Sequence, residues 1–131
     1  MGKTILIVDD DPTILVLLEV NLQLDGYEVI KARDGLEGVE LAKASRPDLI
    51  LMDVMMPKMD GLTARREILD IPELADIPFV FLSAAAQRSD IKKGRDLGAA
   101  DYITKPFDPE ELLAVVERLV AAAPQRQLED Q

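Results

Sequence analysis

The sequence predicts an α/β domain in which five short strands alternate with five helices and form one parallel sheet. Short runs of large apolar residues recur along the chain, and the longer segments between them carry apolar residues at helical spacing. The chain has 131 residues, 48% of them apolar, which suits one domain with a substantial core. Such alternation of strands and helices implies a parallel sheet covered on both faces.

The expected strands differ in polarity, and this difference indicates their order in the sheet. The first, third and fourth are almost wholly apolar, as in strands buried on both faces. The second contains Glu28 and Lys31, and the fifth contains Asp101 and Thr104, which suits the edges. The order 2-1-3-4-5 satisfies this pattern and gives a doubly wound, flavodoxin-like fold. In chain order the strands cover 4–8, 27–31, 49–52, 79–82 and 100–104.

The expected helices are bounded by residues typical of helix ends. Asp11 is placed as an N-cap before Pro12, and Gly26 stands just past the end of the same helix. Asp34 and Asp60 precede the second and third helices. The last helix, which begins near residue 109, shows core spacing at Leu112, Val115, Val116 and Leu119. The first four helices cover about 12–24, 36–44, 61–69 and 89–97.

Composition excludes several classes of function. We expect one domain over 3–121 and a polar, disordered tail over 122–131. The formal net charge of −10 argues against nucleic acid or an anionic membrane as a direct partner. The chain has no cysteine and no histidine, so thiol chemistry is excluded and any metal must be held by oxygen. We see no signal peptide or membrane-spanning stretch, and therefore expect a cytoplasmic protein.

Polar residues stand at the carboxyl ends of four of the expected strands. They are Asp9 and Asp10 after the first strand, Asp53 after the third, Ser83 after the fourth and Lys105 after the fifth. Taken singly, each has an ordinary explanation as a loop acid, a strand-end serine or a surface lysine. In an open parallel sheet, however, ligands bind at this edge near the switch of strand order. We therefore expect the five residues to converge on one site.

Three carboxylates in one small cleft require either a proton or a cation. Mg²⁺ is the natural cation, because it takes oxygen ligands and bridges to phosphate. Lys105 adds one more positive charge, and Ser83 adds a hydroxyl donor. A carboxylate in such a slot, Asp53 above all, can act as the nucleophile on a phosphoryl group and form an acyl phosphate.

Four segments carry a resemblance to a known family. They are Ile-Leu-Ile-Val-Asp-Asp at 5–10, Asp-Val-Met-Met-Pro-Lys-Met-Asp-Gly at 53–61, Leu-Ser-Ala at 82–84 and Gly-Ala-Ala-Asp-Tyr-Ile-Thr-Lys-Pro-Phe at 98–107. On these segments the chain resembles the CheY-like receiver domain of two-component response regulators over residues 3–121. The resemblance implies a phosphoacceptor switch, not an enzyme. Its expected partners are a sensor histidine kinase or histidine phosphotransfer protein and an unknown downstream effector.

The resemblance also implies roles for individual residues. Asp53 would accept the phosphoryl group from a partner's histidine or from a small acyl phosphate. Ser83 and Lys105 would hold the phosphoryl oxygens, and the rotamer of Tyr102 would report the state of Ser83. The peptide bond before Pro106 would be cis. The expected magnesium ligands are Asp10, Asp53 and the backbone carbonyl of Met55, with Asp9 supporting the ion through water.

Two departures from the family pattern concern a dimer. In the transcription-factor branch that dimerises through the last two helices and the last strand, an arginine usually stands where this chain has Val115. That branch also has two acids where this chain has Ala100-Asp101. Both differences argue against that dimer here.

Two alternative functions match parts of the sequence. Residues 9–13 match the Asp-x-Asp-x-Thr motif of haloacid-dehalogenase-like phosphatases, with Asp9 as the nucleophile and with Ser83 and Lys105 as further motifs. That reading lacks a later acid pair, needs a longer core and leaves Asp53 unexplained. A flavodoxin-like FMN carrier is weaker, because the first loop is acidic where a flavin phosphate would need hydrogen-bond donors.

The first helix is apolar nearly all round, although a helix on one face of a sheet needs only one apolar stripe. We assign Ile14, Leu17 and Leu18 to the core. We expect Leu15 and Val16 to be exposed and to form a docking surface for the kinase, as the resemblance suggests. The alternative is that they are scattered surface residues without a role.

Overall fold

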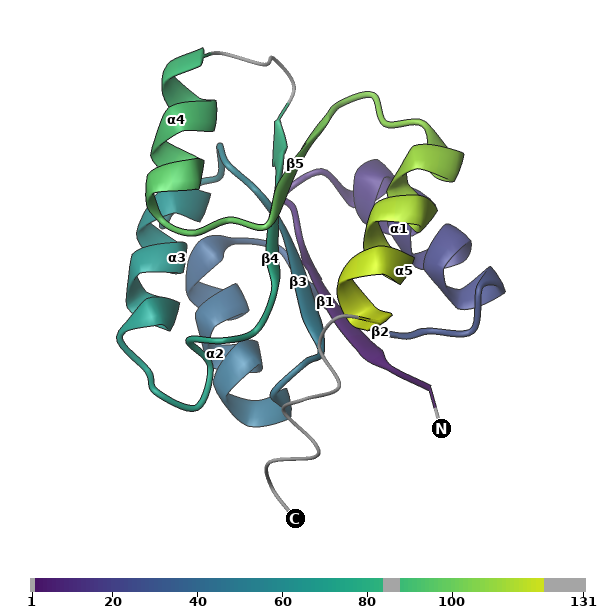
Figure 1. The fold of residues 1–131 in the computed structure, drawn as a ribbon, viewed down its shortest axis with the longest axis horizontal. Coiled ribbons are helices and arrows are strands. Elements are labelled where there is room, and N and C mark those ends of the chain that lie inside the picture. Colours follow the sequence, from purple (N-terminus) through teal and green to yellow (C-terminus); the bar gives the residue numbers. More distant parts are fainter. Residues whose placement is uncertain (1, 84–87, 122–131) are drawn as a thin grey trace.

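The computed structural model describes residues 2–83 and 88–121, and for 88–91 the backbone alone. The tail expected over 122–131 lies outside these residues. Strands and helices alternate along the described chain (Figure 1). In chain order they are β1 (Thr4–Val8), α1 (Pro12–Leu24), β2 (Glu28–Ala32), α2 (Gly35–Ser45), β3 (Leu49–Asp53), α3 (Gly61–Leu69), β4 (Phe79–Ser83), α4 (Arg88–Asp96), β5 (Asp101–Thr104) and α5 (Pro109–Ala121).

All the strands are parallel, in the order β2-β1-β3-β4-β5. The predicted fold class and strand order are therefore confirmed. Every residue of β3 and β4 is buried, whereas β2 and β5 at the edges contain exposed or half-buried residues. The polarity of each strand's residues thus indicated whether the strand is interior or at an edge, because only the interior strands are covered on both faces.

Helices cover both faces of the sheet, and each face has its own core. Alternate residues of the interior strands point to opposite faces. Leu6, Ile50 and Phe79 pack on the side of α2 and α3, which α4 also covers, whereas Ile5, Leu49 and Val80 pack beneath α1 and α5 (Figure 1). This arrangement leaves the carboxyl ends of the strands free of helices and available for a site.

Three helices have the N-terminal cap residues that were expected from the sequence. The Asp11 side chain accepts a hydrogen bond from the Thr13 amide, and the Asp60 side chain accepts one from the Thr63 amide. Asp34 caps α2 in the same way, through the Glu37 amide. The caps satisfy amides that have no partner within their helices. They fix where α1, α2 and α3 begin, just beyond the strand ends.

The orientation of α1 was predicted correctly at Leu18 but wrongly at Leu15 and Leu17. Its buried residues are Leu15, Leu18 and Leu22, while Leu17 is exposed. Leu15 is only 4% exposed, so it belongs to the core and not to a docking surface; Val16, at 54%, is exposed as expected. A helix that is apolar nearly all round offers more than one stripe with helical spacing, so hydrophobicity alone cannot choose between them.

The face of α5 that packs on the sheet was predicted more closely. Leu112 and Val116 are fully buried, and Val115 and Leu119 are partly buried against the same core. Val120 completes the buried stripe. At helical spacing, the charged residues Glu110, Glu111, Glu117 and Arg118 fall on the side opposite the buried ones, so this helix has a single apolar stripe.

Candidate functional site

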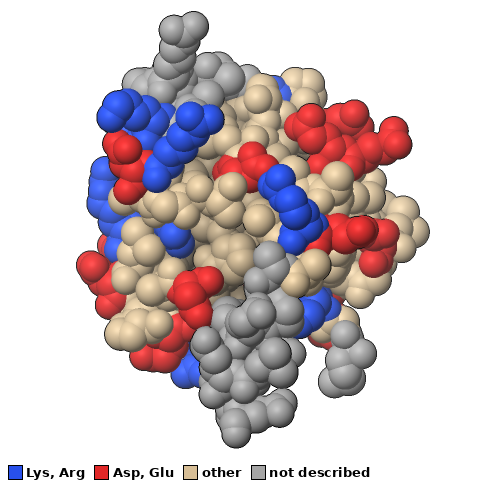
Figure 2. Space-filling model, in the orientation of Figure 1, with Lys and Arg blue, Asp and Glu red and all other residues tan. Residues whose placement is uncertain are grey.

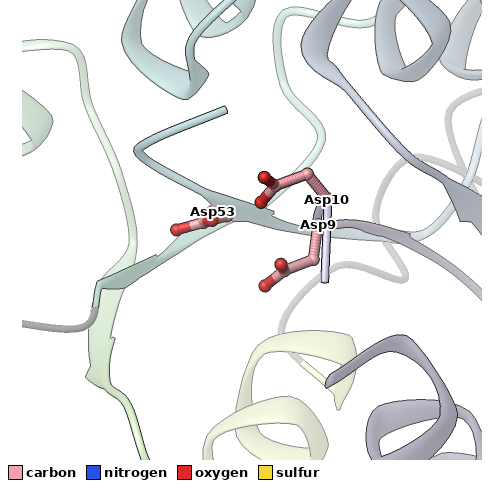
Figure 3. A group of neighbouring side chains, drawn as sticks. All are labelled: Asp9, Asp10 and Asp53. Atoms are coloured by element: carbon pink, nitrogen blue, oxygen red, sulfur yellow. The ribbon is translucent and has the colours of Figure 1, made fainter. Parts of the chain in front are cut away.

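The acidic residues expected at the strand ends converge in space. Asp9 and Asp10 follow β1, and Asp53 is the last residue of the neighbouring strand β3. One carboxylate oxygen from each lies within 4.8 Å of the others. In Figure 3 the side chains from the end of β1 point toward the side on which Asp53 lies. The parallel register produces this meeting, because it sets the ends of β1 and β3 side by side.

Lys105 brings a positive charge to the carboxylates from the end of β5. Its Nζ atom lies 2.9 Å from Asp9 Oδ2 and 3.4 Å from Asp53 Oδ2. Its backbone amide donates to the carbonyl oxygen of Ser83 at 2.6 Å, which ties the ends of β4 and β5 together. The Lys105–Pro106 peptide bond is cis, as the resemblance implied. All the strand-end residues named from the sequence thus lie around one cleft.

The two aspartates after β1 differ in their surroundings. Asp9 is fully buried, and it accepts hydrogen bonds from the Asp11 amide and from Lys105 Nζ. Asp10 is exposed. Asp9 therefore orients Lys105 and the start of α1, whereas Asp10 presents its carboxylate to solvent, where a cation can reach it.

Burial and neighbouring charge alter the acid–base chemistry of the cleft. Burial, and next the negative charge of Asp9, raise the pKa of Asp53 from 3.8 to about 6, although Lys105 and a backbone hydrogen bond from Met55 act in the opposite direction. Burial alone would lower the pKa of Lys105, but its hydrogen bond to Asp9 and the charge of Asp53 raise it overall. Lys105 alone thus leaves the negative charge of the acids incompletely compensated.

The donor set fits a hard cation such as Mg²⁺. The acids offer only oxygen atoms, which Mg²⁺ prefers, and one of the three carboxylates faces solvent. An ion that keeps several waters suits such a half-open site. The raised pKa of Asp53 points the same way, because a nearby cation would relieve the repulsion that contributes to it.

Two glycines allow the segment after Asp53 to pack closely against the end of β3 and the start of α2, a role that was not predicted from the sequence. A Cβ atom at Gly61 would collide with the carbonyl oxygen of Asp53, and the Gly61 amide donates to Val54 O at 2.8 Å. At Gly35, a Cβ atom would collide with the carbonyl oxygen of Met59. A glycine as the first residue of a helix, which occurs in both α2 and α3, was the available signal.

Tyr102 lies beside the cleft and not among its carboxylates. Its ring packs against Phe81 of β4, with ring centroids 6.0 Å apart. Phe81 and Tyr102 are opposite each other in the β4–β5 register, two residues before Ser83 and Thr104. Tyr102 therefore lies on the face of the sheet that α4 covers, two residues before the end of β5.

The face formed by α4, β5 and α5 carries charges that bear on the dimer discussed above. Positive side chains gather over α4, and acids gather over the start of α5 (Figure 2). Asp101 pairs with Arg118 of the same chain at 2.6 Å. The acid that remains before Tyr102 is thus engaged within its own domain.

Comparison with known proteins decides the family. A family model described as the response regulator receiver domain matches residues 5–117. The chain belongs to the receiver-domain family of response regulators. Such domains are phosphoacceptor switches that sensor histidine kinases phosphorylate. The haloacid-dehalogenase-like alternative finds no support. Within the part of the chain that the structure describes, no helix is long and apolar enough to cross a membrane.

Two relatives illustrate how much of other proteins this receiver domain covers. It is 48% identical over 116 residues to the DNA-binding dual master transcriptional regulator RpaA of Synechocystis, covering 88% of this chain but 48% of RpaA. It is 40% identical over 117 residues to Protein PilH of Pseudomonas aeruginosa, covering 89% of this chain and 97% of PilH. The chain thus spans about half the length of RpaA and nearly all of PilH.

Two solved structures share the fold. Chemotaxis protein CheY4 of Vibrio cholerae has a TM-score of 0.86 at 32% identity, covering 91% of this chain and 99% of that one. The receiver domain of the sensor histidine kinase PA1611 from Pseudomonas aeruginosa has a TM-score of 0.86 at 35% identity, covering 92% and 99%. The PA1611 structure is described as having a magnesium ion coordinated in its active-site cleft.

Proposed function

We propose that this receiver domain accepts a phosphoryl group on Asp53 in a Mg²⁺-dependent reaction. One observation carries the proposal: the buried Asp53 carboxylate lies 3.4 Å from Lys105 Nζ and beside the carboxylates that follow β1. A nucleophile, a fixed cation and a set of metal ligands thus share one cleft. Those are the parts that phosphoryl transfer to a carboxylate needs, because catalysis of this reaction is mostly positioning and charge neutralisation.

In the proposed reaction, an oxygen of Asp53 attacks the phosphorus atom of the donor. A P–O bond forms as the bond from phosphorus to the donor breaks, and the donor leaves with that electron pair. Lys105 is placed to hold an oxygen of the transferred group, because its Nζ is already within 3.4 Å of Asp53. Asp9 keeps Lys105 in position through its 2.9 Å hydrogen bond.

The proposed magnesium ligands are Asp10, Asp53 and the backbone carbonyl of Met55. When bound, the ion would neutralise the carboxylates and the incoming phosphoryl oxygens. The magnesium ion described in the active-site cleft of the PA1611 receiver domain supports the choice of metal. Asp9 would support the ion through water, since both of its oxygens already accept hydrogen bonds within the protein.

Ser83 and Tyr102 form the proposed switch. Ser83 is buried at the end of β4, the strand beside β3, which ends at Asp53, and this supports a role for its hydroxyl at the site of phosphorylation. In the β4–β5 register Tyr102 pairs with Phe81, which lies two residues before Ser83 on the same strand. Recruitment of the Ser83 hydroxyl by a phosphoryl oxygen would alter the packing available to Tyr102. Phosphorylation would in this way change the face that α4, β5 and α5 present.

The proposed phosphodonor is a sensor histidine kinase or a histidine phosphotransfer protein, with a small acyl phosphate as a substitute. We place this exchange in the cytoplasm and propose that the domain acts as a switch, not as an enzyme. Docking would use the exposed apolar stripe of α1, formed by Val16, Val20 and Leu24 at four-residue spacing. The net charge of −10 favours a protein effector over direct contact with nucleic acid.

Intact mass spectrometry tests the proposal. The parent protein, incubated with acetyl phosphate and Mg²⁺, should gain the mass of one phosphoryl group, and acid treatment or hydroxylamine should characterise the bond as an acyl phosphate. Asp53→Ala should gain none. Asp48→Ala, which removes an aspartate at the opposite, amino end of β3, serves as the matched control and should react like the parent. A phosphoryl group retained on Asp53→Ala would contradict the proposal.

A further inference from the structure

Arg65 of α3 is a buried cation outside the phosphorylation site. It is only 4% exposed. Among the ion pairs of the described residues, none joins Arg65 to a carboxylate. A buried arginine without an acid is unusual, since charged side chains are seldom fully buried unless they are paired. Its neutral partners therefore indicate what it does.

The guanidinium binds the chain just beyond the end of α4. Nε donates to the carbonyl oxygen of Leu97 at 3.0 Å, and Nη2 donates to that of Gly98 at 3.4 Å. The last carbonyls of a helix have no partner within it and carry the negative end of its dipole. Arg65 thus caps the C-terminal end of α4 from a different helix.

The backbone at this point forms a sharp corner between α4 and β5. Gly98 has a positive φ of 78°, and its amide donates to Arg95 O at 2.9 Å. The Ala99 amide donates to Gly94 O at 3.0 Å. These two bonds form a Schellman motif, which uses the backbone amides and leaves the Leu97 and Gly98 carbonyls for Arg65. We refer to residues 97–99 as the α4–β5 corner.

Arg65 also begins a row of aromatic rings in tilted contact that leads to Tyr102. Its guanidinium carbon lies 4.8 Å from the centre of the Phe79 ring. Phe79 is 5.0 Å from Phe81, and Phe81 is 6.0 Å from Tyr102, measured between ring centroids. Gly94 of α4 closes over the row, because a Cβ atom there would lie 3.0 Å from Phe81 and 3.2 Å from Tyr102. The position of α4 and the seat of the Tyr102 ring are therefore linked.

We propose that Arg65 is a positioning residue that fixes the α4–β5 corner and thereby seats the Tyr102 ring between Phe81 and Gly94. The corner directly precedes β5, which contains Tyr102. The anchoring does not depend on phosphorylation. Its importance for the switch rests on the proposed function, because only there does Tyr102 report the state of Ser83.

Hydrogen exchange tests the anchoring on the full chain without phosphate. Arg65→Met keeps an apolar stem of similar length but removes both hydrogen bonds. Arg66→Met is the matched control, since Arg66 is exposed on the same helix. We expect exchange of the Leu97, Gly98 and Ala99 amides to be about tenfold faster in Arg65→Met than in the control. Equal exchange in the two variants would overturn the proposal.

A second measurement follows the Tyr102 ring. The chain has two tyrosines and no tryptophan, so in Tyr27→Phe the tyrosine fluorescence comes from Tyr102 alone. In that background Arg65→Met should make Tyr102 more accessible to acrylamide, whereas Arg66→Met should not. Faster exchange at the corner without any change at Tyr102 would overturn the second half of the proposal.

Two controls keep the outcomes separate. If Arg65→Met does not fold, Arg65→Lys replaces it, because lysine retains the charge but cannot hold two carbonyls in the same planar geometry. Loss of exchange protection throughout the domain in both variants would overturn the proposal, since Arg65 would then support the whole core. If the parent gains no phosphoryl group from acetyl phosphate, the proposed function fails, while the exchange result still decides the anchoring.

Discussion

Lys105 and Arg65 are both cations largely removed from water, yet their partners differ in kind. Lys105 faces the carboxylates of Asp9 and Asp53. Arg65 faces two neutral carbonyls and an aromatic ring. The interactions of Lys105 therefore change when the charge of the cleft changes, whereas those of Arg65 do not. The charge-sensitive region lies at the carboxyl end of β4, near Ser83, and the charge-insensitive one lies at its amino end, at Phe79.

Truncating Arg65, in the charge-insensitive region, should have the largest effect on stability. Arg65→Ala leaves the Leu97 and Gly98 carbonyls without their donor and opens a cavity beside Phe79. We expect a loss of about 3 kcal/mol in the free energy of unfolding, measured with urea. The loss should be the same with and without Mg²⁺. A loss that depends on Mg²⁺ would show that the two regions are not separate.

Without metal, the stability of the folded protein should depend on pH because of Asp53. The folded protein holds a proton on Asp53 up to about pH 6, whereas the unfolded chain releases it near 3.8. Between these values the folded state binds the proton more tightly, so this group's contribution to stability falls as pH rises through the window and stays low above it. The difference of about 2 units corresponds to about 3 kcal/mol at most.

Asp53→Asn isolates that contribution. Relative to the parent, the variant should gain stability from pH 4 to pH 7 in urea unfolding without metal. Asp70→Asn, at an exposed position, is the control and should follow the parent. A parallel course for Asp53→Asn and the parent would show that Asp53 does not titrate as its surroundings indicate.

Magnesium should produce a smaller gain in stability, and this gain should depend on the acids of the cleft. Binding to the folded state alone stabilises it by mass action, by about 1–3 kcal/mol at concentrations well above the dissociation constant. We expect Mg²⁺ to raise the melting temperature of the parent and of Arg65→Met alike. Asp10→Asn should lose most of this shift. A full shift in Asp10→Asn would remove Asp10 from the proposed ligands.

The smallest effect on stability is expected at the exposed apolar stripe of α1. Val16→Lys changes an exposed side chain, so the free energy of unfolding should change by no more than about 0.5 kcal/mol. Phosphorylation by acetyl phosphate should be unchanged, while transfer from a cognate kinase should slow. Leu36→Lys, at an exposed apolar position on α2, is the control. Equal slowing in the two variants would argue against a docking surface on α1.

The strand ends were predictable because their signal is local. Asp53 ends a run of four large apolar residues, and parallel pairing then places such ends together whatever the helices do. The orientation of α1 was not predictable, because Leu15 and Leu17 are alike in character and packing against the sheet decided between them. Arg65 was missed for a different reason. It lies on the buried stripe of α3 with Leu62 and Ile68, and that spacing was the available signal.

The hydrogen bond between Lys105 and Asp9 joins residues that are 96 positions apart in the chain. Contacts of such long sequence separation form late, because closing the intervening loop costs entropy that only the assembled sheet repays. During synthesis, Asp9, Asp10 and Asp53 leave the ribosome long before their lysine does. A nascent chain that ends before β5 therefore contains every acid of the cleft but lacks the cation that pairs with Asp9 and Asp53. The ion pairs of the cleft are thus completed only after the last strand has been added.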